Sequence, residues 1–122
     1  MEDKPTILVV DDTPENIDIL VGILKESYRV KAAISGEKAL KSAKKNPPDL
    51  ILLDIMMPGM DGYQVFEQLK ADPVTANVPV VFVTGRSESA DLEKGMAMGA
   101  RGYLTKPVDP VKVTTLVHEI LS

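Results

Sequence analysis

Three short runs of almost wholly apolar residues are the feature of this sequence that most limits its fold. They occupy residues 6–10, 50–53 and 80–83. Runs of this length suit strands, and strands without polar alternation are typical of a parallel sheet that is covered on both faces. Two weaker runs, 29–34 and 102–105, complete the set. We therefore expect a sheet of five strands with a layer of helices on each side.

Helical periodicity fills the segments between these runs. Apolar residues recur at i, i+3, i+4 and i+7 after the first run and again at the carboxyl end of the chain. These positions are Ile17, Leu20, Val21 and Leu24, and Val113, Leu116, Val117 and Ile120. In the segment 88–98, Leu92 and Met96 are the candidates for a buried face, although Gly95 and Gly99 weaken the pattern. Strands that alternate with helices predict an open, doubly wound α/β sheet.

Several helix starts are marked by capping residues. Thr13-Pro14 and Asp109-Pro110 each place a capping side chain before a proline at the first helical position. Asp61 and Gln64 have the spacing of a capping box. We therefore read Asp61 and Gly62 as turn and cap residues rather than as chemistry.

Composition limits the classes of function. The 122 residues fit a single domain spanning 1–122. The absence of cysteine excludes disulfides and zinc–thiolate sites. A net charge of −4 without a basic stripe argues against direct binding of nucleic acid. No apolar run approaches the roughly 20 residues of a membrane span. We expect a cytoplasmic protein that contacts neither nucleic acid nor membrane.

Polar residues follow four of the predicted strands at the point where each strand ends. The carboxyl ends of parallel strands share one edge of the sheet, where the functional groups of such folds gather. The residues that we expect to meet there are Asp11 and Asp12, Asp54, Thr84 and Lys106. An aspartate after a strand is often only a turn or cap residue, so the prediction of a site depends on all five groups sharing this edge.

Three carboxylates at one edge repel one another, and their pKa values rise unless positive charge lies among them. Lys106 supplies one positive charge. A hard divalent cation would supply the rest, and oxygen ligands favour magnesium. The sequence therefore predicts a magnesium site at this edge.

At this point the sequence resembles the receiver domains of two-component response regulators. Four segments carry the resemblance in the expected order: "ILVVDD" (7–12), "DLILLDIMMPGMDG" (49–62), "VVFVTG" (80–85) and "YLTKP" (103–107). The resemblance covers the whole chain. It implies the (βα)5 fold of chemotaxis regulators, which is flavodoxin-like, with strand order 2-1-3-4-5.

The resemblance also implies a chemistry for this edge. Asp54 holds the place of the aspartate that accepts a phosphoryl group from a phosphohistidine of a sensor histidine kinase or histidine phosphotransfer protein. Asp12 would bind Mg²⁺ directly, Asp11 mainly through water, and the backbone carbonyl of Met56 would complete the protein ligands. Mn²⁺ would substitute for Mg²⁺. The chain would catalyse its own phosphorylation and slow dephosphorylation, and would not be a turnover enzyme.

The remaining site residues follow from the same resemblance. Thr84 and Lys106 would contact the phosphoryl oxygens, and Thr84 with Tyr103 would form a switch. The switch would change the surface of the segment 88–98, the strand 102–105 and the last helix. We expect a partner or a second copy of the chain to bind that surface.

Two positions beside the acceptor are less typical of receiver domains. Met56 and Arg86 lie two residues after Asp54 and Thr84, where side chains tune the loss of the phosphoryl group. The chain is either a stand-alone receiver or part of a longer protein.

Three other functions fit the sequence less well. Phosphatases of the haloacid dehalogenase type need a second acid where Met56 stands. A flavin protein of similar topology would carry a phosphate loop rich in Ser, Thr and Gly, whereas residues 11–16 are acidic. A passive scaffold with this fold would be more credible if Asp54 or Lys106 were missing, and both are present.

Overall fold

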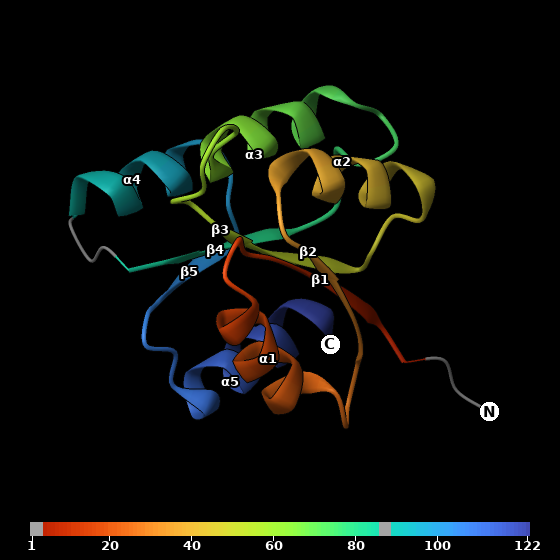
Figure 1. Cartoon of the computed structure of the whole chain (residues 1–122), viewed down its shortest axis with the longest axis vertical. Coiled ribbons are helices and arrows are strands. Elements are labelled where there is room, and N and C mark those ends of the chain that lie inside the picture. Colours follow the sequence, from red (N-terminus) through yellow and green to blue (C-terminus); the bar gives the residue numbers. More distant parts are fainter. Residues whose placement is uncertain (1–3, 86–88) are drawn as a thin grey trace.

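The structure is a computed structural model that describes residues 4–85 and 89–122. Strands and helices alternate along the chain (Figure 1). In order they are β1 (Thr6–Val10), α1 (Pro14–Leu24), β2 (Arg29–Ala33), α2 (Gly36–Lys45), β3 (Leu50–Asp54), α3 (Gly62–Ala71), β4 (Val80–Thr84), α4 (Ser89–Ala97), β5 (Gly102–Thr105) and α5 (Pro110–Leu121). None of the helices in the described residues is long and apolar enough to cross a membrane.

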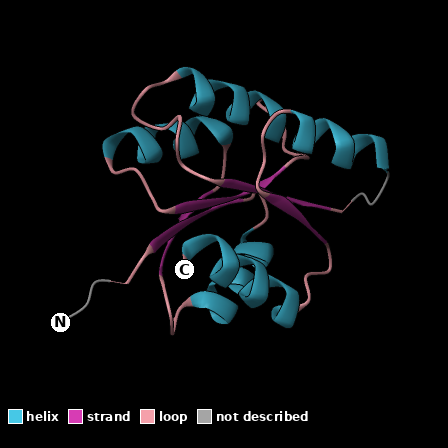
Figure 2. Cartoon of the chain, turned by 180° about the vertical axis from the view of Figure 1, so that it is seen from behind, coloured by secondary structure: helices cyan, strands magenta, loops and turns pink. Residues whose placement is uncertain are grey.

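The strands form one parallel sheet in the order β2-β1-β3-β4-β5, which confirms the predicted topology. Helices α1 and α5 cover one face of the sheet, and α2, α3 and α4 cover the other (Figure 1). The view from behind shows the same three layers (Figure 2). All strands run in one direction, so their carboxyl ends share one edge of the sheet.

Strand alternation divides the core into two apolar clusters. Alternate residues of β1, β3 and β4 point to opposite faces. Leu8, Ile51 and Phe82 belong to the cluster under α2 and α3, whereas Ile7 and Leu52 belong to the cluster under α1 and α5. Every residue of β3 and β4 is buried. Burial of one such apolar side chain contributes about 1.5–3 kcal/mol, so the central strands are firmly held.

The predicted helix caps are largely confirmed. The Asp61 side chain accepts a hydrogen bond from the backbone N–H of Gln64, and the Gln64 side chain accepts one from the N–H of Asp61, both at 2.9 Å. Asp109 accepts from the N–H of Val111 at 2.9 Å. Thr13 occupies the predicted capping position of α1, but its side chain makes no capping hydrogen bond with the described residues.

Helix α4 exists as predicted, but the expectation that Met96 faces inward is wrong. Its side chain is 46% exposed. The helix instead approaches the sheet through Gly95, where an added Cβ atom would lie 2.7 Å from the ring of Phe82. Such a close approach of backbone to ring requires glycine. Gly95, which weakens the helical pattern in the sequence, is therefore a residue through which α4 packs against the sheet. The Leu92 side chain lies outside the described residues.

Candidate functional site

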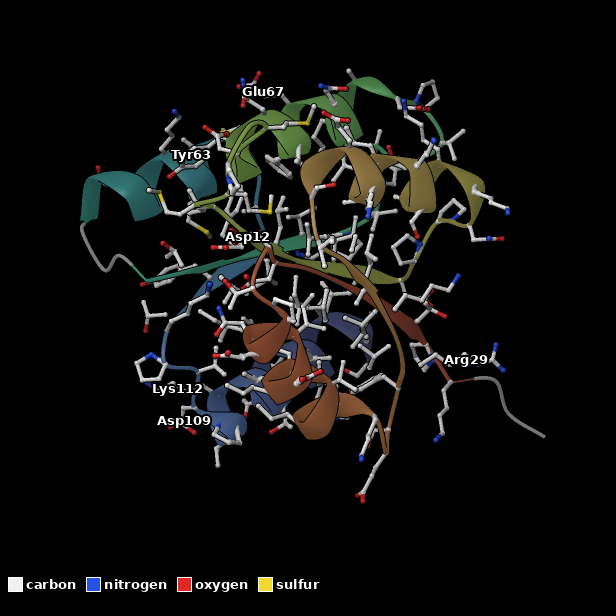
Figure 3. All side chains as sticks on the ribbon, viewed as in Figure 1. Asp12, Arg29, Tyr63, Glu67, Asp109 and Lys112 are labelled. Atoms are coloured by element: carbon white, nitrogen blue, oxygen red, sulfur yellow. The ribbon has the colours of Figure 1, made fainter. Side chains whose placement is uncertain are left out.

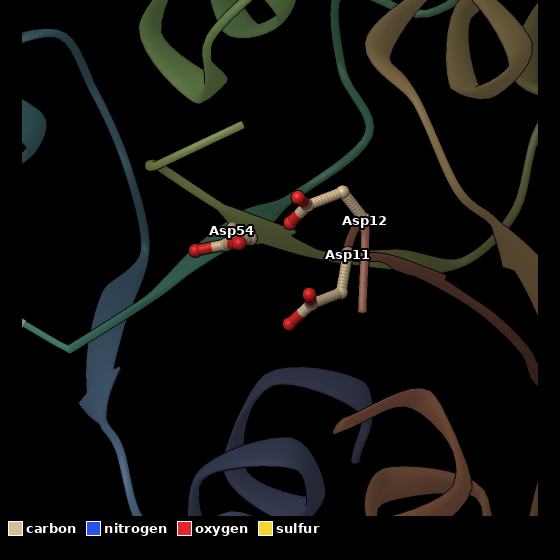
Figure 4. Close-up of side chains that lie close together, drawn as sticks. All are labelled: Asp11, Asp12 and Asp54. Atoms are coloured by element: carbon tan, nitrogen blue, oxygen red, sulfur yellow. The ribbon is translucent and has the colours of Figure 1, made fainter. Parts of the chain in front are cut away.

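Three aspartates meet at the carboxyl edge of the sheet, as the sequence predicts. One carboxylate oxygen from each of Asp11, Asp12 and Asp54 lies within 4.8 Å of the others (Figure 4). The cluster forms because β1 and β3 are neighbours and Val10 pairs with Leu53. Asp11, which follows β1, and Asp54, the last residue of β3, are therefore side by side.

A lysine that follows β5, two strands away from β3, joins this cluster. The Lys106 ammonium lies 2.9 Å from Oδ2 of Asp11 and 3.4 Å from Oδ2 of Asp54. Its backbone N–H donates to the Thr84 carbonyl at 2.8 Å, which holds the residue after β5 against the end of β4. The sheet register therefore places one cation against two carboxylates from different strands.

Backbone amides orient two of the carboxylates. The Thr13 N–H donates to Oδ1 of Asp11 at 2.9 Å, and the Met56 N–H donates to Oδ1 of Asp54 at 3.3 Å. Thr13, at the capping position of α1, thus donates its backbone amide to Asp11, whereas its side chain makes no capping hydrogen bond with the described residues. The sequence did not assign either amide to its carboxylate, because every residue except proline carries a backbone amide and the sequence gives no signal of its direction.

The donor set fits a hard cation. Asp11 and Asp54 are only 1% and 2% exposed. Oδ2 of Asp11 is buried and, although Lys106 lies beside it, no described residue gives it a hydrogen bond of acceptable geometry. Three carboxylates and one ammonium leave a net charge of −2 when all are ionised. Magnesium takes oxygen ligands, usually one or two carboxylates together with water, and this cluster offers such carboxylates.

The charges of the cluster also shift two pKa values. Burial, followed by repulsion from Asp11, raises the pKa of Asp54 to about 6, and the Lys106 charge offsets part of this rise. Burial lowers the pKa of Lys106, but its 2.9 Å ion pair with Asp11 and the charges of both aspartates outweigh burial and raise it overall. The surroundings of Asp54 therefore disfavour its ionised form, and a cation placed beside the carboxylate would stabilise that form.

This arrangement has a counterpart in a known family. The sequence pattern described as "Response regulator receiver domain" matches residues 7–118. The chain belongs to the response regulator receiver domain family. It is accordingly a phosphoacceptor module of two-component signal transduction and acts as a switch.

Relatives of the receiver domain include proteins of different output. It is 46% identical over 120 residues to a probable cyclic di-GMP phosphodiesterase of Vibrio cholerae, covering 97% of this chain and 27% of that protein. It is 38% identical to protein PilH of Pseudomonas aeruginosa, covering 95% of this chain and 97% of PilH. A crystal structure of a putative response regulator from Chloroflexus aurantiacus matches with a TM-score of 0.92 and 33% identity, covering 98% of both chains.

The shares of these relatives differ widely. The receiver domain spans about a quarter of the phosphodiesterase but nearly all of PilH. The name phosphodiesterase describes that relative as a whole, so it says nothing of the chemistry at the aspartate cluster.

The structure does not bring every predicted residue to the cluster. Thr84 is buried at the end of β4 and pairs with Thr105 in the sheet. Tyr103 is instead 44% exposed and lines a hollow with Lys112 of α5. Figure 3 shows Lys112 near the start of α5, well away from Asp12. Arg86 lies outside the described residues.

Proposed function

We propose that Asp54 accepts a phosphoryl group from the phosphohistidine of a sensor histidine kinase or histidine phosphotransfer protein. An Asp54 carboxylate oxygen attacks phosphorus and an O–P bond forms. The P–N bond breaks, and the imidazole nitrogen keeps its electron pair. The observation that carries the proposal is the Lys106 ammonium, which lies within 3.4 Å of this carboxylate and 2.9 Å of Asp11.

The same residues would hold a divalent cation. Asp11, Asp12 and Asp54, with the backbone carbonyl of Met56, form the proposed site for Mg²⁺, or for Mn²⁺ in its place. A bound cation neutralises charge on the phosphoryl oxygens. The buried Oδ2 atom of Asp11, to which no described residue gives a well-formed hydrogen bond although Lys106 lies beside it, supports this proposal.

Residues of the chain itself orient and stabilise the transfer. The Met56 N–H, which donates to Oδ1 of Asp54, leaves Oδ2 as the attacking oxygen on the side of Lys106. Lys106 and the Thr84 hydroxyl are the proposed partners of the transferred oxygens. Positive charge and donors fixed in advance at such a site stabilise the transition state without reorganisation. Met56 and Arg86 remain the predicted tuning positions for the loss of phosphate.

The donor protein would dock over α1 and the loop after β5. A hollow of about 100 Å³ opens there beside Lys106, and its walls include Leu20, Val83 and Val108. Ile19, also in its lining, is 52% exposed. An exposed apolar side chain in a hollow that Lys106 also lines suits contact with an apolar patch of the donor protein.

The output surface is proposed to be the face of α4, β5 and α5. Thr84 and Tyr103 lie on the paired strands β4 and β5, so a turn of the Thr84 hydroxyl toward phosphate would free space for Tyr103 to move inward. A homodimer through this face is part of the proposal. The single domain over 1–122, the cytoplasmic location, and the absence of nucleic-acid and membrane contacts stay predictions from the sequence.

Intact-mass spectrometry tests the acceptor directly. The chain is incubated with acetyl phosphate and MgCl₂, and we expect the addition of one phosphoryl group. Asp54→Asn should abolish it, and EDTA should abolish it in the wild-type chain. Asp18→Asn, on the exposed side of α1, is the control that should react normally. Full phosphorylation of Asp54→Asn, or full reaction in EDTA, would refute the proposal.

A further inference from the structure

Gly62, the first residue of α3, makes an unusually close contact with the end of the acceptor strand. A Cβ atom built on Gly62 would lie 2.4 Å from the backbone oxygen of Asp54 and 2.7 Å from the Cα atom of Ile55. Real Cβ atoms essentially never approach other atoms closer than 3.0 Å. The residue read from the sequence as a cap therefore touches the peptide unit that directly follows the acceptor.

We propose that Gly62 is a positioning residue for phosphoryl transfer, because its missing side chain lets the first turn of α3 pack against and fix the peptide unit between Asp54 and Ile55. The inference rests on the proposed function of this site. Gly62 touches neither phosphate nor metal. It acts through the main chain that carries both the attacking carboxylate and the backbone carbonyl proposed as a metal ligand.

Two sets of hydrogen bonds hold Gly62 in this place. Its N–H donates to the Ile55 carbonyl at 2.9 Å, which closes the loop between β3 and α3. The reciprocal bonds of Asp61 and Gln64 fix the turn immediately around it. Behind it, the buried side chains of Val65 and Phe66 anchor α3 to the core. The turn therefore cannot retreat from the strand end without breaking bonds on both sides.

The atoms that a side chain at this position would meet cannot yield easily. The oxygen of Asp54 is a main-chain atom of β3, whose residues are all buried, and the Cα atom belongs to Ile55, the buried residue that directly follows β3. Relief of the contact from 2.4 to 3.0 Å requires a displacement of at least 0.6 Å. Reactive groups need placement to within about 0.5 Å, and a misplacement of about 1 Å costs on the order of a hundredfold in rate.

Gly36 offers a matched control on the neighbouring helix. A Cβ atom there would lie 2.6 Å from Cγ2 of Val65 and 3.1 Å from Sδ of Met60. Both of these neighbours are side-chain atoms, so Gly36→Ala disturbs the packing of α3 through Val65 but places no atom against the main chain at the end of β3. Comparison of Gly62→Ala with Gly36→Ala therefore distinguishes an effect of disturbed packing from a displacement of the main chain at Asp54.

The test compares the wild-type chain, Gly62→Ala and Gly36→Ala at a temperature where circular dichroism shows each to be folded. Calorimetry measures Mg²⁺ affinity, and mass spectrometry follows phosphorylation by acetyl phosphate at saturating Mg²⁺. We expect Gly62→Ala to react about tenfold or more slowly and to bind Mg²⁺ more weakly. Gly36→Ala should match the wild type in both measurements. Wild-type behaviour of Gly62→Ala, or equal losses in both variants, would overturn the inference.

Two further outcomes are informative. If the wild-type chain takes no phosphate at Asp54, the proposed function fails, while the comparison of Mg²⁺ affinities still tests the contact made by Gly62. If Gly62→Ala does not fold, Gln64→Ala replaces it, because that change removes the acceptor of the Asp61 N–H without altering charge. Its Mg²⁺ affinity should then fall a few-fold relative to Gln68→Ala on the same helix, and equal affinities would overturn the inference.

Discussion

Asp54→Asn should make the metal-free receiver domain more stable at neutral and alkaline pH, although it removes the acceptor. The wild-type carboxylate is buried beside Asp11, and its pKa in the folded chain is about 6 rather than the ordinary 3.8. Between these two values the folded chain binds more protons than the unfolded chain. The stability of the wild type therefore falls as pH rises from about 4 to above 6.

The size of this effect follows from the two pKa values. Their difference of 2.2, at about 1.4 kcal/mol for each pKa unit, corresponds to about 3 kcal/mol. An asparagine is neutral at every pH and has nearly the same shape, so it avoids this cost. For a chain of this length, about 3 kcal/mol corresponds to a rise of about 10 °C in Tm.

Thermal unfolding in EDTA, followed by circular dichroism at pH 4 and pH 8, measures the difference. We expect the two proteins to unfold at similar temperatures at pH 4, and Asp54→Asn to exceed the wild type by about 10 °C at pH 8. Asp18→Asn should show no such gap. Addition of Mg²⁺ should raise the Tm of the wild type and narrow the difference. A destabilised Asp54→Asn at pH 8, or a gap independent of pH, would refute the electrostatic account of the cluster.

Other parts of the structure give further expectations. Ile19→Ala should slow phosphorylation by a histidine phosphotransfer protein but not by acetyl phosphate. If the variant reacts at the wild-type rate with both donors, α1 is not part of the docking surface. Gly95→Ala places a Cβ atom 2.7 Å from the Phe82 ring and should cost about 1–3 kcal/mol in urea unfolding. Gly22→Ala in α1, where an added Cβ atom meets none of the described residues within 4 Å, should instead stabilise the chain by up to about 1 kcal/mol. The ring resonances of Tyr103 should shift on phosphorylation, and an unchanged spectrum of this face would exclude the switch.

The sequence predicted the strands and the aspartate cluster because both follow from local signals. The apolar run 50–53 identifies β3, and its last residue, Asp54, then lies at the edge that parallel strands share. The capping box of Asp61 and Gln64 is also a local pattern. Such features need only the spacing of residue types within a few turns of the chain.

What the sequence did not predict depends on contacts between distant segments. The hollow that Tyr103 lines together with Lys112 depends on the packing of β5 against α5. The inward face of α4 was misjudged because Gly95 packs against Phe82 and Met96 does not. The contact of Gly62 with Asp54 arises across a loop, and a glycine in a sequence looks the same whether or not a backbone lies 2.4 Å from its missing Cβ atom.

A crystal structure of the chain with beryllofluoride and Mg²⁺ would test the central claim most directly, because beryllofluoride bonded to a carboxylate imitates its phosphorylated form. The account predicts beryllium bonded to Asp54, Mg²⁺ held by Asp12 and the backbone carbonyl of Met56, and the Lys106 ammonium against fluoride. Beryllofluoride on any other carboxylate, or Lys106 turned away from it, would contradict the claim that these residues form one phosphoryl-transfer site.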